Sequence, residues 1–236
     1  MAKQETSLTD WLIVQDASND IHEIIAVLGE ITARISLVIR KAPKEGNDGI
    51  TDSVNVQGEV QKTLDIVTHD LMVEGLSSCG QVAAMVSEEF PDLINNRSCA
   101  HDADIVACFD PLDGSSNIET NSAIGTIFSL LRVESKGAGV SEKDVLAASN
   151  NQIAAGYVLY GPASLLVLTL GKSVAVFTLD PESDEFLLVK DELSIVPEAA
   201  EFAINMAYQR FWEPALANYI ADCVAGCDGP RAREFN

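Results

Sequence analysis

Basic residues are scarce in this 236-residue chain, where 15 Lys and Arg stand against 36 Asp and Glu, a formal net charge of −21. Binding to nucleic-acid phosphates or to anionic membranes depends on clustered Lys and Arg, so this balance argues against both kinds of partner. Apolar residues are not scarce, since they make up 47% of the chain and can offset the entropy cost of ordering it. We therefore expect a folded protein whose carboxylates either hold cations or keep its surface soluble.

Cysteine is also scarce, and its pattern is not that of a disulfide framework. The five cysteines are an odd number, unlike the dense even sets of small secreted domains. Cys223 and Cys227 lie four residues apart, but no second Cys or His pair lies nearby in sequence to complete a zinc site. We therefore expect both to be reduced and buried as small apolar side chains. The other cysteines, expected in or near the core, are Cys79, Cys99 and Cys108.

Apolar runs long enough to cross a membrane are missing as well. The stretch from Val145 to Gly171 has no charge, but Gly156 and the Gly161-Pro162 pair interrupt it, whereas a spanning helix needs about 20 consecutive apolar residues. The first residues include Lys and Glu and no apolar segment, so they do not resemble a secretory signal. We predict a cytoplasmic protein, with an organelle as the alternative if a transit peptide is absent from this chain.

The apolar periodicity that is present predicts an α/β fold. Apolar residues recur every three or four positions between Asn19 and Lys41, which is typical of an amphipathic helix, and Pro43 is expected to end that helix. Three short apolar runs separated by turn residues predict an antiparallel meander, and the Gly- and Asn-rich segment 45–59 predicts a flexible loop. The expected helices are 8–14, 19–41, 60–77 and 214–225, and the expected strands are 82–86, 105–109, 153–160, 164–170 and 173–179.

Acidic residues follow two of the predicted strands. Strand 82–86 leads into Glu88 and Glu89, and strand 105–109 leads into Asp110. Side chains at strand ends are held by a rigid scaffold, which is a usual location for sites in open α/β structures. On spacing alone, however, solvated loop residues are the simpler interpretation of the two glutamates.

The segment 109–118 changes this interpretation. Asp110 and Asp113, separated by a rigid Pro111, can direct carboxylate oxygens at one point, and Mg²⁺ prefers such oxygen ligands. The Gly-Ser-Ser run 114–116 offers backbone N–H groups to an anion where a helix is expected to begin. The sequence therefore predicts a metal site beside a phosphate cradle.

The sequence FDPLDGSSN at 109–117, with VSEE at 86–89, closely resembles the signature of the fructose-1,6-bisphosphatases and their sedoheptulose-1,7-bisphosphatase relatives. These enzymes belong to the Mg²⁺-dependent, lithium-sensitive phosphatase superfamily. The resemblance covers essentially the whole chain. Its supporting blocks are residues 40–41, 58–65, 125–128, 154–162 and 177–180. Inositol monophosphatases are less similar, because they typically carry threonine after the Asp-Gly, where this chain has Ser115.

The resemblance implies roles for individual residues. Asp65 and Glu89 would activate the attacking water, and Glu59 would assist from a loop that closes over the site. The implied metal ligands are Glu88, Asp110, Asp113 and the backbone carbonyl of Leu112. The implied substrate-binding residues are Asp113, Gly114, Ser115, Ser116, Asn205 and Tyr208. The histidines lack metal-type spacing, and we expect ordinary helix or surface residues at His22, His69 and His101.

These assignments imply a phosphoric monoester hydrolase that releases the 1-phosphate of fructose 1,6-bisphosphate, of sedoheptulose 1,7-bisphosphate, or of both. Two or three Mg²⁺ ions, or Mn²⁺ in their place, would neutralise the phosphate and activate water. The resemblance also implies a homo-oligomer, a dimer or a tetramer, in gluconeogenesis or the Calvin cycle. Two alternatives stay open: a catalytically silent regulatory or scaffold relative, and an inositol or nucleotide phosphatase of the same superfamily.

The resemblance further implies a layered α/β/α/β/α fold, with mixed sheets flanked by helices. Residues 1–190 are expected to form an N-terminal metal- and phosphate-binding domain, and residues 191–236 the start of a C-terminal sugar-binding domain. Family members continue beyond Asn236 with another Glu ligand and with basic residues that grip the sugar, so we expect the second domain to be incomplete. Asp104-Ile105 replaces a Lys-Tyr pair that helps vertebrate relatives to bind AMP, which argues against that mode of control.

Overall fold

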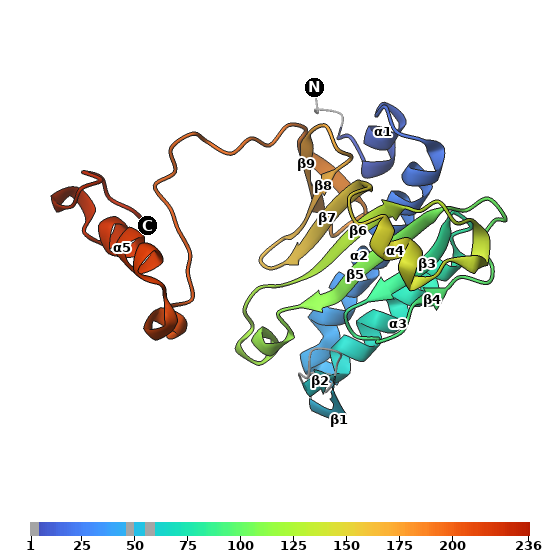
Figure 1. Ribbon diagram of the computed structural model, residues 1–236, viewed down its shortest axis with the longest axis horizontal. Helices are drawn as coiled ribbons and strands as arrows, with labels where there is room; N and C mark the ends of the chain where they lie inside the picture. The colour runs from blue at the N-terminus through green and yellow to red at the C-terminus, as the bar shows by residue number, and fades with distance from the viewer. Residues whose placement is uncertain (1–4, 46–49, 55–59) are drawn as a thin grey trace. The chain divides into compact units, whose positions relative to one another are not determined.

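The computed structural model describes residues 5–45, 50–54 and 60–236. The chain divides into two compact units, Met1–Leu193 and Ser194–Asn236 (Figure 1). None of the helices in the described ranges combines the length and the apolar character that a membrane span requires.

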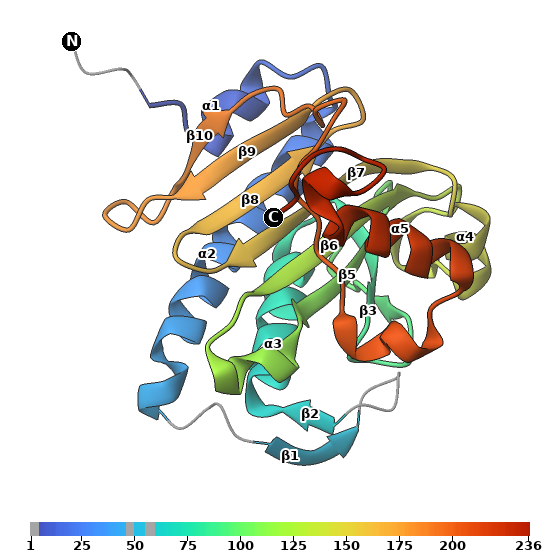
Figure 2. The same cartoon turned by 90° about the vertical axis from the view of Figure 1, so that its left-hand side faces the viewer.

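The first unit is built around a mixed sheet (Figure 2). In the described part of the chain this sheet has eight strands, in the order β10-β9-β8-β7-β6-β5-β3-β4. Strands β3 and β5 are parallel, and the other neighbouring pairs are antiparallel. The strands are β3 (Val82–Ser87), β4 (Ile94–Asn95), β5 (Ile105–Asp113), β6 (Ile124–Arg132), β7 (Gln152–Tyr160), β8 (Ser164–Thr169), β9 (Val174–Leu179) and β10 (Phe186–Lys190). A separate antiparallel pair joins β1 (Ile50–Val54) to β2 (Val60–Lys62).

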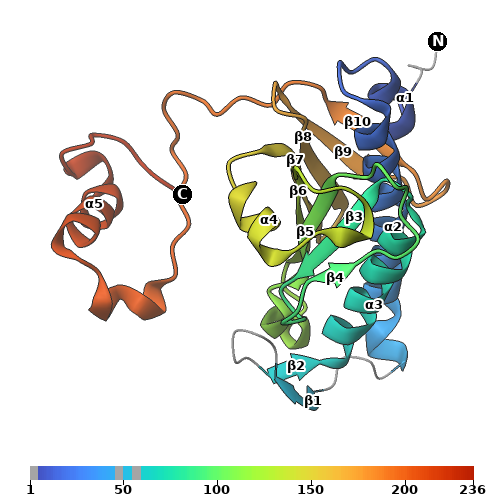
Figure 3. The ribbon, with the colours of Figure 1, turned by 45° about the vertical axis from the view of Figure 1, so that its right-hand side comes forward.

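Helices lie on both faces of the larger sheet (Figure 3). Three of them, α1 (Leu8–Ile13), α2 (Asn19–Glu45) and α3 (Thr63–Ser78), are on one face, and the short α4 (Glu142–Ala147) is on the other. Short 3-10 helices, η1 (Ser115–Thr120) and η2 (Gly137–Gly139), connect the strands. The layered α/β architecture expected from the sequence is confirmed.

The main core lies between α1–α3 and the sheet. The apolar stripe of α2 includes Ile24, Leu28 and Ile35, which are all buried against sheet residues such as Leu130 and Phe177. Burial of an aliphatic side chain of this size contributes about 1.5–3 kcal/mol relative to exposure. A second, smaller cluster packs Ala148, which follows α4, against alanines and valines of β3 and β5. The two faces of β6 and β7 differ, because Phe128 and Val158 are buried whereas Ile127 and Tyr157 are exposed.

The expected helix and strands differ from the observed ones near the site. Helix α2 continues to Glu45, so Pro43 does not end it; one missing N–H donor weakens the last turn without terminating it. The segment expected to be a loop contains β1, and β2 precedes α3 where a helix was expected to begin. The antiparallel meander is confirmed as β7, β8 and β9.

Strand β5 also runs four residues further than expected, through the signature to Asp113. Asp110 pairs with Ile127 and Asp113 with Gly125, so β5 has one more residue than β6 over this stretch. This extra residue is a β-bulge, which allows Pro111 to be accommodated in a strand although it cannot donate a hydrogen bond.

The second unit contains η3 (Met206–Phe211), α5 (Pro214–Val224) and η4 (Gly226–Asp228). Its two ends are joined by backbone hydrogen bonds from Phe202 N to Asn236 O at 3.1 Å and from Asn236 N to Ala200 O at 2.9 Å. Cys223 is buried in this unit as expected, but Cys227 is exposed, because the chain has left α5 at that point. Its neighbour in space is Glu234, whose carboxylate accepts a hydrogen bond from Cys227 N at 3.1 Å.

Candidate functional site

The parallel pairing of β3 and β5 brings the acidic ends of the two strands together. Ser87 lies opposite Phe109 in the register, and Glu88 N donates a hydrogen bond to Phe109 O at 3.0 Å. Glu88 and Glu89 are therefore beside Asp110, although both are more than 20 positions away from it in the sequence. All three are partly buried, so none of them is a fully solvated side chain.

The signature forms a rigid turn at the end of β5. Asp110 Oδ1 accepts a hydrogen bond from Leu112 N at 3.0 Å, and the buried Thr126 hydroxyl donates to Pro111 O at 2.9 Å. Gly114 has φ of 79°, a left-handed conformation that favours glycine. The 3-10 helix η1 begins directly after it, at Ser115. The first N–H groups of such a helix have no acceptor within the helix, so this turn presents donors where the sequence predicted a phosphate cradle.

The carboxylates at this edge influence one another. Burial raises the pKa of Asp110 to about 6, although the hydrogen bond from Leu112 opposes the rise. Repulsion from Asp113, Glu89 and Asp65 adds to the increase. Asp65 is buried in the first turn of α3, whereas Asp113 is exposed. Three of the predicted acidic residues thus lie close enough to Asp110 to make its ionisation less favourable.

These residues fit a hard cation by their chemistry, because carboxylate and carbonyl oxygens are the ligands that Mg²⁺ prefers. A finished coordination shell is nevertheless not in place. Within residues 5–45, 50–54 and 60–236, no three His, Cys, Asp or Glu side chains are arranged so that they could hold a metal ion. The oxygen donors lie at one edge of the sheet, where β3 and β5 end.

His69 is a site residue that the sequence did not suggest. It projects from α3, and its Nδ1 lies 2.9 Å from the Ser87 hydroxyl, which accepts a hydrogen bond from Glu89 N at 3.3 Å. Burial lowers the pKa of His69, against the opposing influence of Asp70 and Glu89. A neutral ring can accept the Ser87 proton at Nδ1, so His69, Ser87 and the Glu89 backbone form one chain of hydrogen bonds.

Three of the predicted residues lie outside the described part of the first unit. Glu59 lies outside the described residues. Asn205 and Tyr208 belong to the unit Ser194–Asn236. Within that unit the Asn205 side chain caps η3 by accepting a hydrogen bond from Ala207 N at 3.0 Å, and Tyr208 is exposed.

A shallow pocket of about 180 Å³ adjoins Asp113. Gly125 and the exposed side of β7, including Tyr157 and Leu159, form its wall. A side chain at Gly125 would place its Cβ 2.8 Å from Val158 O, so only glycine permits this close approach. We call this hollow the Asp113 pocket.

A mixed sheet with acidic strand ends beside a Gly-Ser-Ser turn has the character of a phosphate-handling α/β protein. The family model for the N-terminal domain of fructose-1,6-bisphosphatase matches residues 7–191. The chain belongs to the fructose-1,6-bisphosphatase family, whose members are phosphoric monoester hydrolases. The expectation from the signature is thereby confirmed.

Individual relatives agree with this assignment. The chain is 45% identical over 219 residues to a class 1 fructose-1,6-bisphosphatase of Shewanella amazonensis, covering 93% of this chain and 67% of the relative. It is 44% identical over 230 residues to that of Shewanella baltica, covering 98% and 69%. The crystal structure of Leishmania major fructose-1,6-bisphosphatase in holo form superposes with a TM-score of 0.89 at 29% identity, covering 99% of this chain and 72% of the other.

Proposed function

We propose that this protein is a Mg²⁺-dependent sugar bisphosphatase that hydrolyses the 1-phosphate of fructose 1,6-bisphosphate. The single observation that carries the proposal is the pairing of β3 with β5, which sets Glu88 and Glu89 beside the signature residue Asp110. Membership of the family supports the choice of substrate, because the curated relatives are named for fructose 1,6-bisphosphate.

The residues at this edge of the sheet would have separate roles in binding the metal and the phosphate. Glu88, Asp110 and Asp113, with the carbonyl of Leu112, would hold the metal. When bound, Mg²⁺ supplies the positive charge that phosphoryl transfer to water requires. The N–H groups of the turn 114–116 would bind the oxygens of the phosphate that is cleaved.

The remaining acids would handle the proton. Asp65 is buried in the first turn of α3 and Glu89 follows β3, and both are close enough to raise the pKa of Asp110. A carboxylate in such surroundings can orient a water molecule and accept its proton as it attacks phosphorus. Glu59 would help to bind an additional metal ion. Because water attacks directly, Ser115 and Ser116 bind phosphate and do not act as nucleophiles.

The division of labour between the units is part of the proposal. Residues 1–190 would bind metal and the 1-phosphate, and residues 191–236 would begin the sugar-binding domain. Asn205 and Tyr208 would contact the distal phosphate. Sedoheptulose 1,7-bisphosphate shares the reacting end of the molecule and is a second candidate substrate. The homo-oligomer, dimer or tetramer, and the cytoplasmic location stay predictions.

Phosphate release from the purified full-length protein tests this function. The assay uses fructose 1,6-bisphosphate, sedoheptulose 1,7-bisphosphate, inositol 1-phosphate and AMP as separate substrates, each with Mg²⁺, Mn²⁺ or EDTA. We expect metal-dependent release from fructose 1,6-bisphosphate. Release from inositol phosphate or AMP alone would replace the proposed substrate. Binding of Mg²⁺ with no turnover of any substrate would support the catalytically silent alternative and contradict the proposal.

A further inference from the structure

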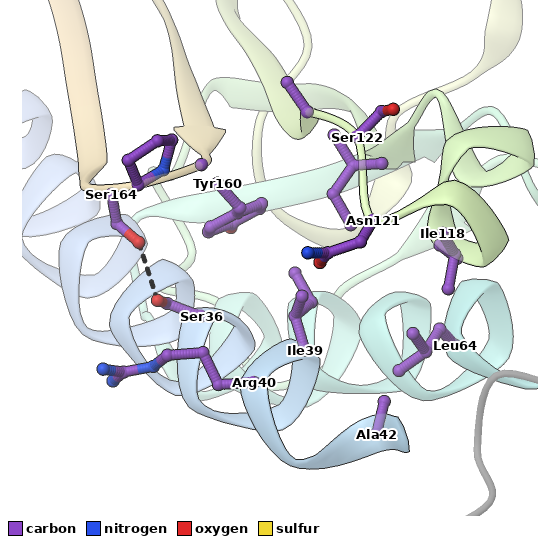
Figure 4. Close-up of a pocket in the computed structure, with 14 residues that line it drawn as sticks. Ser36, Ile39, Arg40, Ala42, Leu64, Ile118, Asn121, Ser122, Tyr160 and Ser164 are labelled. Carbon is purple, nitrogen blue, oxygen red and sulfur yellow. Dashed lines mark hydrogen bonds between the residues drawn. The ribbon is translucent and has the colours of Figure 1, made fainter.

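A second and larger hollow lies on the other side of the sheet from the Asp113 pocket. It has a volume of about 460 Å³, within the range of small-molecule sites. The end of α2, the start of α3, the segment 121–124 and the β7–β8 turn enclose it (Figure 4). We call it the α2 cavity. Tyr160, on the buried face of β7, forms part of its wall, whereas Tyr157 and Leu159 border the Asp113 pocket.

The lining of the α2 cavity combines an apolar floor with a cationic rim. Ile39, Leu64 and Ile118 form the floor. Arg40 is the one charged residue among the described lining residues, although the chain has 36 acidic side chains. None of the ion pairs within the described residues involves Arg40. The guanidinium of Arg40 therefore favours an anion locally, against the long-range repulsion from a net charge of −21.

Polar groups add to the rim. The hydroxyls of Ser36 and Ser164 lie 2.7 Å apart and join α2 to β8. Across the opening, Figure 4 shows the Asn121 amide directed into the cavity. A few polar groups around an apolar body are the usual composition of a site for a small organic molecule.

The geometry points to a binding site for a small organic anion, with a carboxylate at Arg40 and an apolar body on the floor of the α2 cavity. An inorganic ion would leave the floor uncovered, and a neutral molecule would make no use of the guanidinium. The class of ligand is therefore an aromatic or branched carboxylate.

The α2 cavity shares a wall with the Asp113 pocket, because Ala123 and Ile124 line both hollows. The shared segment is tied to the signature turn through Asn117. The Asn117 amide donates to Ala123 O at 3.1 Å, and Asn117 N donates to Gly114 O at 2.8 Å. A ligand in the α2 cavity would hence restrain the turn that holds Gly114, and its binding would alter turnover. This second step rests on the proposed function, whereas the binding itself does not.

Direct binding is the first measurement, with 4-fluorobenzoate as the probe and fluorine NMR as the readout on the whole chain. We expect saturable binding, at least about tenfold weaker binding of the neutral 4-fluorobenzamide, and no competition by inorganic phosphate. Equal binding of the amide, or displacement by phosphate, would overturn the assignment of an organic anion, and the absence of any binding would overturn the site.

Substitutions at lining residues test whether the probe binds in the α2 cavity. Arg40→Gln should weaken 4-fluorobenzoate binding about tenfold. Arg34→Gln is the matched control, because Arg34 is an exposed residue of the same helix outside the α2 cavity, and it should leave binding unchanged. Ala42→Leu adds bulk at a buried lining position and should also reduce binding. Thermal melting checks that each variant is folded. Equal weakening by Arg34→Gln and Arg40→Gln would contradict a specific site.

Turnover is the second measurement. Phosphate release from fructose 1,6-bisphosphate should change with 4-fluorobenzoate in the wild-type chain and not in Arg40→Gln. If the chain binds the probe but hydrolyses no substrate, the proposed function fails and the α2 cavity remains a site. If the chain hydrolyses its substrate and the bound probe has no effect, the coupling through Asn117 is wrong.

Discussion

Acidic residues have opposite electrostatic surroundings at the two ends of strand β5. At its beginning, Asp104 and the helix residue Asp20 flank Arg132, at 2.5 Å and 2.8 Å from its guanidinium nitrogens. At its end, the charged neighbours that act on Asp110 are the carboxylates of Asp113, Glu89 and Asp65. One end pairs charges of opposite sign, and the other places like charges together.

The pKa values follow this difference. Burial opposes ionisation of Asp20, but hydrogen bonds from Ser18, Arg132 and the Ile21 N–H outweigh it and lower its pKa. Burial and like charges raise the pKa of Asp110 to about 6. The first arrangement stabilises the fold, whereas the second costs stability while Asp110 is ionised and no cation is bound. The comparison therefore supports the proposed site at the end of β5, rather than at its beginning.

Replacement of Asp113 should have the largest effect. Asp113→Ala removes an exposed acid from the signature, so the fold should survive while phosphate release from fructose 1,6-bisphosphate falls by about a hundredfold or more. The matched control is Asp102→Ala, an exposed acid near the other end of β5, which should leave release unchanged. Rates and thermal melts of both variants check this expectation. Unchanged turnover in Asp113→Ala would refute the role of the signature.

Replacement of Arg132, near the beginning of β5, should instead change stability more than turnover. Arg132→Gln leaves two partly buried carboxylates without their shared cation. This should lower the free energy of unfolding by about 2 kcal/mol. Turnover without denaturant should change little. Lys172→Gln is the comparison, because its ion pair with Asp16 is exposed and should contribute nothing measurable. Urea titrations of the three proteins measure the difference.

Lowering the pH should reduce the loss of stability that Arg132→Gln causes. The pKa of Asp20 is lowered in the folded state, so its stabilisation is present above the unfolded value of about 3.9 and is lost as the pH falls through the folded value. The difference in stability between wild type and variant should therefore begin to shrink below about pH 4. A difference in stability that is constant from pH 7 to pH 3 would show that Arg132 acts through packing instead.

A smaller effect is expected for the positioning residue His69. His69→Ala removes the acceptor for Ser87 and should lower kcat about tenfold with little change in KM, because it loosens the Glu89 backbone and leaves the phosphate cradle intact. His69→Asn keeps an acceptor near the Nδ1 position and should restore most of the rate. A rise in KM alone, or no rescue by Asn, would argue against this role.

Much of the proposed site at the end of β5 could be predicted from the sequence, because the residues that indicate it lie within short segments. The acids that follow β3 and β5 and the Gly-Ser-Ser turn lie within short segments, and one register of parallel strands brings them together. The amphipathic α2 and the β7–β9 meander were predictable for the same reason, since periodicity is a local property.

The rest depends on contacts between distant residues. His69 and Ser87 are 18 positions apart, and Asp20 and Arg132 are 112 apart, so neither pair has a signature in the chain. The extension of β5 to Asp113 was missed because Pro111 normally argues against a strand, and the bulge opposite β6 that accommodates it is a feature of pairing. The α2 cavity likewise exists only where four elements meet.

The most exacting comparison replaces Asp110 in metal-free buffer. A carboxyl whose folded pKa is raised from 3.8 to about 6 lowers stability progressively as the pH rises between these values. In EDTA at pH 7, Asp110→Asn should therefore stabilise the chain, by about 1 kcal/mol after allowance for partial exposure, and the gain should vanish at pH 4. Urea titrations at both pH values measure it, and Asp104→Asn, at the other end of β5, should destabilise at pH 7 instead. If Asp110→Asn also destabilised there, like-charge repulsion would not distinguish the two ends of the strand.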